Sequence, residues 1–276
     1  MPKRFSTARG REFGDAVRAA LSATGMTARE ICEKIDWDPG KLSDLMNGKG
    51  GCSEVDVAIL LSFCRIVPEE RDHLLRLLRE TDMKDWWQKH GDHQPILPRT
   101  WFEHLQKAKV FTSWCPLVVP GLLQVPDYTR AVILANPNAP HDELEQRVAA
   151  RQAMQEIFRQ RLRSTFYIHE QVLVLPVGGR DVLRDQLHHL LRMLVRPYID
   201  VRIVPTDTGA HAGLGGAFDL MTFDRYEPTV FLDTENSTLI VESAGAVKAH
   251  SEVLTSLAAI ALDAEQSREK ITELAT

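Results

Sequence analysis

The sequence predicts a chain of two parts: a mainly α N-terminal helix-turn-helix domain of five helices, and an α+β C-terminal domain with an antiparallel sheet covered by helices. Three features lead to this prediction. Apolar residues recur at helical spacing between capping residues over 1–80, charged residues with Gly and Pro mark 81–98, and short alternating segments crowd 201–241. We therefore expect a helix-turn-helix domain at 1–80, a Trp-containing linker at 81–98 and an α+β domain at 99–276.

The composition is that of an ordinary folded protein. The 276 residues are 44% hydrophobic, enough for two buried cores, and no apolar run approaches the ~20 residues of a membrane span. Cys32, Cys52, Cys64 and Cys115 have neither CxxC nor zinc-finger spacing, and no signal peptide is evident. We expect a cytoplasmic protein with reduced thiols, no metal, no other cofactor and no membrane role.

Capping residues predict the start and the end of two short helices. Thr27 and Glu30 form a capping box that opens the first of them, which runs to Lys34. Asp38 caps the second and Pro39 occupies its first turn, where an amide has no intrahelical acceptor. The Asn-Gly pair at 47–48 tolerates left-handed backbone geometry and ends that helix.

These two helices have the pattern of a helix-turn-helix, whose second helix would lie in the major groove of duplex DNA. Ile31 and Ile35 line one face of the first helix, and Leu42 and Leu45 one face of the second, so the pair needs flanking helices for stability. Any small helical bundle with the same punctuation is the alternative. Lys41 and Ser43 are our first choices among the candidate DNA-contacting residues, which are Thr27, Arg29, Asp38, Gly40, Lys41, Ser43, Asp44, Asn47, Lys49, Arg4 and Arg9.

The net charge of −5 argues against a broadly basic surface, although affinity for duplex DNA comes largely from phosphate contacts. Residues 1–79 carry 13 Lys and Arg against 12 Asp and Glu, a net charge of +1, while the remainder carries 20 against 26, a net charge of −6. Lys3, Arg4, Arg9 and Arg11 precede any acidic residue. This arm would touch backbone phosphate or the minor groove, and a disordered basic end is the alternative.

Three further helices complete the predicted bundle, at residues 9–24, at 53–64 behind a Ser53–Asp56 cap, and from Pro68 onward. In the linker we expect the adjacent Trp86 and Trp87 to anchor against a neighbouring surface. His90 and His93 have no accompanying ligand set, and we interpret them as solvated.

The C-terminal domain begins with a helix at 101–109 and a strand at 110–114. Helices are expected from Pro126, over 142–161, over 182–194 and over 244–264, with Ser267 capping a last short turn. The strands are expected at 165–169, 201–204, 217–223, 229–232 and 238–241.

Several motifs are spread over most of the chain. They are WFEHLQKA at 101–108, VPGLLQVPDYTRA at 119–131, RVAARQ at 147–152, VGGRDVLRDQLHHLL at 177–191, VRIVPTDTGAH at 201–211 and GAFDLMTF at 216–223. With these motifs nearly the whole chain resembles one family, the actinobacterial WhiJ-like regulators, which join a Cro/repressor-type (XRE) helix-turn-helix to a C-terminal domain with no established chemistry. The resemblance implies a transcription regulator, usually a repressor, often encoded beside a small partner protein in an arrangement likened to toxin and antitoxin pairs.

The predicted recognition helix departs from that family at two positions. Asp44 stands where an arginine is usual, and a carboxylate in the groove repels phosphate, so either the operator differs or Asp44 faces away from DNA. Ala28 stands where a glutamine often contacts phosphate, which leaves Arg29 as the nearest donor.

The sequence contains no GxSxG, HExxH or phosphate-loop motif, so we expect no enzyme. The Gly-rich segment 209–216 is interpreted as a flexible hairpin, and Cys115 as a core residue. An enzyme that uses His211 and Glu170 has no motif to support it. Candidate ligand-binding residues in this domain are Trp101, Trp114, Glu170 and His211.

Two functions remain. The first is a DNA-binding regulator whose C-terminal domain senses a small molecule or a partner. The second is an antitoxin-like interaction module that sequesters a small partner protein, encoded nearby, and binds DNA weakly. A homodimer is expected in the first case, because one recognition helix reads too few base pairs.

Overall fold

The chain divides into two compact units, Met1–Trp86 and Trp87–Thr276. Lys3, Arg4 and His93, which the sequence analysis singled out, lie outside the residues described. The computed structural model describes residues 6–81, 85–90, 98–224 and 226–276.

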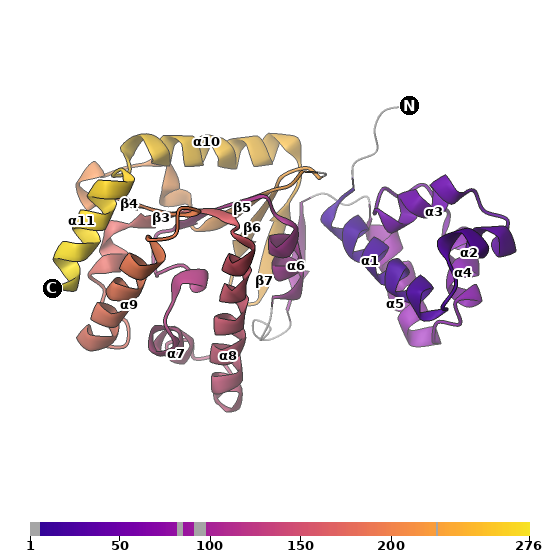
Figure 1. Ribbon diagram of the computed structural model, residues 1–276, viewed down its shortest axis with the longest axis horizontal. Coiled ribbons are helices and arrows are strands. Elements are labelled where there is room, and N and C mark those ends of the chain that lie inside the picture. Colours follow the sequence, from indigo (N-terminus) through magenta and orange to yellow (C-terminus); the bar gives the residue numbers. More distant parts are fainter. Residues whose placement is uncertain (1–5, 82–84, 91–97, 225) are drawn as a thin grey trace. The chain divides into compact units, whose positions relative to one another are not determined.

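Within its described residues, the first unit contains five helices, as the sequence predicts (Figure 1). Both predicted capping boxes form, Thr27 with Glu30 and Ser53 with Asp56. The Asp38 carboxylate accepts hydrogen bonds from two first-turn amides of the third helix. The helices are α1 (Ala8–Ala23), α2 (Ala28–Ile35), α3 (Pro39–Met46), α4 (Glu54–Phe63) and α5 (Pro68–Glu80).

One shared core stabilises α2 and α3, which are too short to be stable alone. Their apolar faces pack with residues from all three flanking helices. The buried members are Phe13, Val17, Leu21, Ile31, Cys32, Leu42, Leu45, Val57, Leu60, Leu61, Leu74 and Leu77.

The backbones of α1 and the end of α3 are packed closely at glycines. A Cβ atom on Gly14 would lie 2.5 Å from the backbone oxygen of Met46, and one on Gly10 would overlap the backbone oxygen of Gly48. Gly48 itself has a φ of +68°, which a side chain disfavours. These contacts fix the position of α3 on the bundle.

The second unit is an α+β domain around a seven-stranded sheet of order β1-β7-β6-β5-β2-β3-β4. Its strands are β1 (Trp86–Lys89), β2 (Val110–Cys115), β3 (Arg163–His169), β4 (Ile199–Val204), β5 (Phe218–Thr222), β6 (Thr229–Asp233) and β7 (Ser237–Val241). Its helices are α6 (Arg99–Lys107), α7 (Pro126–Leu134), α8 (Leu144–Met154), α9 (Arg180–Met193), α10 (Ala244–Ile260) and α11 (Ala264–Ala275).

The sheet is mixed, whereas the sequence analysis expected an antiparallel one. Strands β5, β6 and β7 are antiparallel as predicted, and β2 pairs antiparallel with β5. Strands β2, β3 and β4 are parallel. Helices α7 and α8 separate β2 from β3, and α9 separates β3 from β4, so each connection is a crossover long enough to return the chain in the same direction.

Helices cover both faces of this sheet (Figure 1). Helix α10 packs on one face through Val247, Leu254 and Leu257. Helices α7, α8 and α9 lie on the opposite side, and α11 lies beside α9 and β4. Helix α6 joins the second face, because Trp101 contacts Phe111 of β2 edge-on at 6.0 Å.

Several local predictions differ from the structure. Residues 86–89 of the predicted linker form the edge strand β1, and Trp87 is 52% exposed, so its ring does not anchor a linker. Ser267 does not cap a turn: Asp263 caps α11, and the buried Ser267 hydroxyl accepts a hydrogen bond from the Ile203 amide at 3.0 Å. The helix predicted over 142–161 is divided into α8 and two flanking 3₁₀ segments.

Candidate nucleic-acid interface and C-terminal cavity

Helix α3 presents one exposed face. Leu42 and Leu45 are buried in the core, so the residues between them in the helical turn point outward. Gly40, Ser43 and Asp44 are exposed. The structure thus brings three of the sequence-predicted residues together on one surface of a helix that the bundle holds rigidly.

Lys41 has a different environment from the one expected of a free DNA contact. Its Nζ atom lies 2.9 Å from Oδ2 of Asp56 on α4, and 4.4 Å from the ring centroid of Trp37. The hydrogen bond from Lys41 lowers the pKa of Asp56, and the bonds from Ser53 lower it further. Lys41 is therefore partly neutralised by its own domain.

The other cations near α3 also have acidic neighbours. Lys49 lies 3.3 Å from Asp44, and Arg29 lies 3.2 Å from Glu33. Asp44 therefore compensates a neighbouring lysine, which the sequence analysis did not anticipate. The exposed surface around α3 carries charges of both signs.

Further predicted residues support the local fold. The Thr27 hydroxyl is engaged with Glu30 in the cap of α2, and the Asn47 amide donates to the Ser43 carbonyl oxygen at 2.8 Å. Arg18, which the sequence analysis did not select, donates to the backbone oxygen of Met46 at 3.0 Å and so caps the end of α3. Arg9 lies 3.7 Å from Glu12 on its own helix.

The second unit contains a cavity of about 240 Å³ beneath α6 and α8, on the sheet face opposite α10. Two of the candidate ligand-binding residues, Trp101 and Trp114, border it, but the Trp114 ring packs in the core under α10, on the other face of the sheet. The Trp101 Nε1–H donates to Asp219 at 2.9 Å, and the Trp114 Nε1–H donates to the Gly213 carbonyl oxygen at 2.8 Å. The Phe111, Phe166 and Phe231 side chains also line it, whereas Phe218 borders it but packs its ring against His250 of α10.

Three charged residues in the cavity wall, Arg151, Asp219 and Asp233, were not selected from the sequence. The Asp219 carboxyl lies deep in the protein, and burial raises its pKa to about 7, although hydrogen bonds from Ser113 and Trp101 oppose the shift. Arg151 of α8 lines the same cavity, and burial lowers the pKa of its guanidinium group, a shift that the charge of Asp233 opposes. Burial also raises the pKa of the nearby Cys115 thiol to about 12, so this thiol is not a nucleophile at neutral pH.

Each of the two units matches a known protein family. Residues 12–74, which cover most of α1–α5, match a family described as a helix-turn-helix domain. Residues 99–273, well over half of the chain, match the family described as a domain of unknown function, DUF5753. The chain belongs to the DUF5753 family. No curated protein and no solved structure matches it.

Glu170 and His211 have structural partners within the DUF5753 domain. Glu170 lies 2.6 Å from Lys270 of α11 and accepts the Thr206 amide at 2.8 Å, and the hydrogen bond from Lys270 is the main reason its pKa is lowered. His211 stacks on His169 with ring centroids 5.8 Å apart. The Gly-rich segment is not a free hairpin, because Gly213 lies against the Trp114 ring, leaving no room for a Cβ atom.

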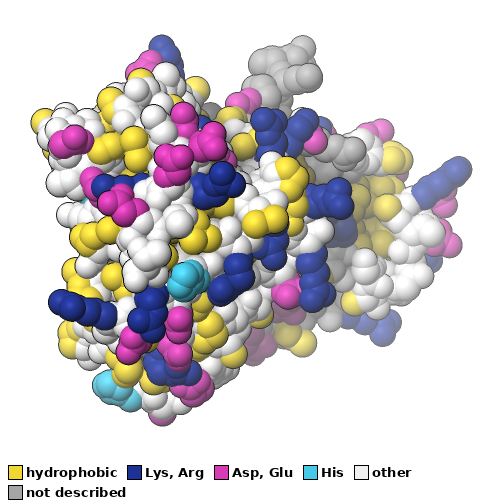
Figure 2. All heavy atoms as spheres, turned by 60° about the vertical axis from the view of Figure 1, so that its left-hand side comes forward, with side chains coloured by type: hydrophobic (Ala, Val, Ile, Leu, Met, Phe, Trp, Pro, Cys, Tyr) yellow, Lys and Arg dark blue, Asp and Glu magenta, His cyan; other side chains and the backbone are white. Residues whose placement is uncertain are grey.

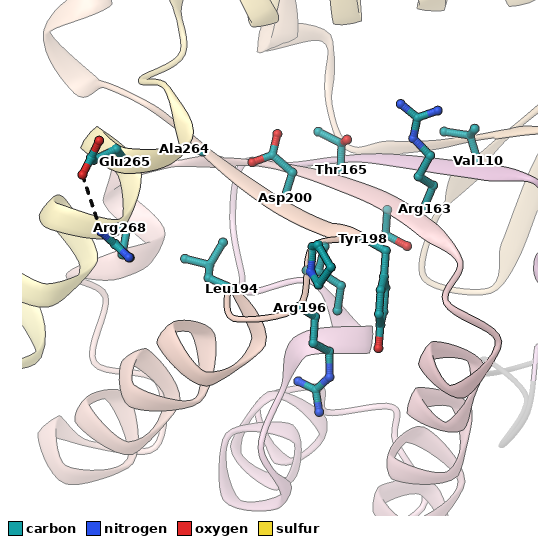
Figure 3. Close-up of a pocket in the computed structure, with 13 residues that line it drawn as sticks. Val110, Arg163, Thr165, Leu194, Arg196, Tyr198, Asp200, Ala264, Glu265 and Arg268 are labelled. Carbon is teal, nitrogen blue, oxygen red and sulfur yellow. Dashed lines mark ion pairs between the residues drawn. The ribbon is translucent and has the colours of Figure 1, made fainter.

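A larger, open depression of about 720 Å³ lies at the end of the DUF5753 sheet near β3 and β4. Figure 3 shows that its basic residues do not converge: Arg163 points to one side of the sheet, whereas Arg196 and Tyr198 point to the other. Arg268 is paired with Glu265. Acidic and basic side chains are both spread over the face of the molecule drawn in Figure 2. We therefore assign no anion site to this depression.

Little in the sequence marks the charged residues of the DUF5753 cavity as site residues. Asp219 lies between Phe218 and Leu220 in a strand that is covered on both faces, where an acid is unusual. Arg151 is one of several arginines on a charged helix. Within the described residues, no cluster of three or more His, Cys, Asp or Glu could hold a metal ion. No helix there is long and apolar enough to cross a membrane.

Proposed function

We propose that this protein is a sequence-specific DNA-binding transcription regulator that acts as a repressor through α3. The match of residues 12–74 to a helix-turn-helix family carries the proposal. The exposed face formed by Gly40, Ser43 and Asp44 supports it, because a helix of this kind enters the major groove. A regulator bound over a promoter excludes other proteins from it, which is the role implied by the resemblance to XRE-type, WhiJ-like proteins.

We propose that the DUF5753 domain senses a small molecule and that its cavity is a binding site rather than a catalytic one. The cavity supports this role, since it combines aromatic walls with a few polar groups, as ligand sites do. Trp101 and Asp219 hold each other by a hydrogen bond at the cavity wall, so the site is formed in advance.

A homodimer fits this proposal, because two recognition helices read paired half-sites. Helix α4 offers apolar surface for such an interface. Val55 is 69% exposed and Ile59, one turn later, is 50% exposed. Exposed apolar side chains at this spacing favour contact with another protein surface.

An antitoxin-like module that captures a small partner protein and binds DNA weakly is the alternative. The pairing of Lys41, Lys49 and Arg29 with acids favours it, because cations already paired in the free protein add less to phosphate binding. Val55 and Ile59 would then contact the partner.

Selection of duplexes from a random library, followed by salt titration, separates the two functions. The regulator predicts enrichment of one sequence and a selected site bound at least ~10³-fold more tightly than a scrambled duplex. The alternative predicts no enrichment, together with capture of the protein encoded by the adjacent gene. Enrichment without partner capture would contradict the alternative, and capture without enrichment would contradict the regulator.

A further inference from the structure

In the part of the chain that the structure describes, Arg151 is a partly buried cation that has no ion pair, although the charge of Asp233 in the same cavity wall acts on it. Its one hydrogen bond there, to Oε1 of Gln124, is 3.4 Å long. Arg147, one turn earlier on α8, has the usual arrangement, with Glu143 at 2.7 Å.

The surrounding hydrogen bonds do not use the remaining donors of Arg151. The Gln124 Oε1 atom already accepts a bond from Thr129 at 3.1 Å, and Nε2 of Gln124 donates to the Val119 oxygen at 2.7 Å. Gln124 is thereby fixed and cannot turn to serve Arg151 better. The guanidinium has five N–H groups, so most of them are left for a group inside the cavity.

Both acids in the cavity wall accept hydrogen bonds from other residues, although the charge of Asp233 also favours the Arg151 cation. Asp219 is held by Ser113 and Trp101, and Asp233 accepts a hydrogen bond from Thr238 at 2.6 Å. Neither carboxyl forms an ion pair with Arg151. A partly buried cation that has no ion pair favours an anion supplied from outside.

The other residues of the cavity wall indicate the size and polarity of the part of the ligand that Arg151 does not bind. Phe111, Phe166 and Phe231 of the sheet, Trp101 of α6 and Met154 of α8 all line the cavity. At about 240 Å³ the cavity is smaller than the ~300–1,000 Å³ of sites for drug-sized ligands. A single cation in a wall that also holds Asp219 and Asp233 suits one carboxylate on a small apolar body better than a doubly charged phosphate.

We propose that the DUF5753 cavity binds a small organic carboxylate with an aromatic or branched apolar body, whose carboxylate pairs with Arg151. Two parallel N–H···O bonds from the guanidinium would orient it, and the body would lie among the aromatic side chains. The effector role of this ligand rests on the proposed function, but its binding does not.

The test uses the full chain and three matched probes: 3-phenylpropanoate, 3-phenylpropylamine and 3-phenylpropanamide. Binding is followed by calorimetry and by tryptophan fluorescence, to which Trp101 in the cavity wall contributes. We expect saturable binding of the carboxylate, at least ~10-fold tighter than that of the amine or amide. Binding of the amine or amide with equal affinity would overturn the proposal. Absence of saturable binding by 3-phenylpropanoate, benzoate and 4-methylpentanoate alike would also overturn it.

Arg151→Gln should weaken carboxylate binding at least ~10-fold, and Arg159→Gln, at a side chain 82% exposed outside the cavity, should leave it unchanged. Equal binding by Arg151→Gln and the wild type would overturn the assignment. If Arg151→Gln fails to fold, the proposal is tested by comparing the affinities of the wild type for 3-phenylpropanoate and 3-phenylpropanamide. Duplex binding is measured separately: carboxylate binding without duplex binding would contradict the proposed function alone, and duplex binding without carboxylate binding would contradict this inference alone.

Discussion

The Nζ atom of Lys41 lies 2.9 Å from Oδ2 of Asp56, so the only lysine of the recognition helix is paired with the first turn of α4. This contact explains how a helix-turn-helix can have a nearly neutral surface. It also sets a condition on DNA binding, since phosphate must compete with Asp56 for Lys41.

Asp56→Asn should raise duplex affinity. The change removes the charge that competes for Lys41 but keeps an oxygen that can accept the Ser53 cap. We expect tighter binding and a slope of log K against log salt that is more negative by about 1, measured by fluorescence anisotropy between about 50 and about 200 mM salt. Lys41→Ala should have the opposite effect, and unchanged affinity and slope in both variants would remove Lys41 from the interface.

Asp44→Asn should strengthen binding to all duplexes. Asp44 is exposed on the recognition helix and pairs with Lys49 at 3.3 Å, so its removal eliminates one repulsion and frees one cation. We expect similar gains on selected and scrambled duplexes, with no change in melting temperature. A loss of binding confined to the selected duplex would instead show that Asp44 accepts a hydrogen bond from a base, as from a cytosine amino group.

Gly14→Ala should destabilise the first unit. The new methyl group would lie 2.5 Å from the Met46 oxygen, forcing α1 away from the end of α3. We expect a loss of about 1–3 kcal/mol in the free energy of unfolding, measured by urea denaturation. Gly245→Ala provides the control, because a Cβ atom there meets nothing within 4 Å. Equal stability of the two variants would contradict the close packing.

Asp219→Asn should change the pH dependence of stability. The pKa of Asp219 is raised from 3.8 to about 7 in the folded state, so the folded chain holds a proton that the unfolded chain has lost between these values. Stability therefore falls as pH rises through this window, by about 4 kcal/mol for this group.

The asparagine variant lacks this ionisation and should be the more stable form at pH ~8, with little difference at pH ~4. The difference in melting temperature between the variant and the wild type at each pH isolates the contribution of Asp219 from that of the groups common to both proteins. A difference that does not change with pH would contradict the raised pKa.

Local signals were readable in the sequence, because each depends on neighbours within one turn. The Thr27–Glu30 and Ser53–Asp56 boxes and the left-handed Gly48 were predicted and are confirmed. The five-helix bundle and the α+β class followed from these signals together with hydrophobic periodicity.

Features that depend on tertiary contacts could not be predicted from the sequence. The parallel pairing of β2, β3 and β4 follows from how α7, α8 and α9 cross the sheet. The Lys41–Asp56 pair depends on the packing of α3 against α4, and the placement of Arg151 and Asp219 in one cavity wall depends on how α8 packs against the sheet. Serine is a common N-cap residue, but Asp263, four residues before Ser267, caps α11 instead.

The central claim, that the exposed face of α3 enters the groove, is tested most directly by placing a negative charge on it. Ser43→Glu alters an exposed residue whose neighbours Leu42 and Leu45 hold the helix in place, and Thr255→Glu places the same charge on the exposed face of α10. Affinity for the selected duplex, measured by anisotropy, should fall at least ~10-fold for Ser43→Glu and stay unchanged for Thr255→Glu. Equal affinity of the two variants would show that the chain does not read DNA through α3.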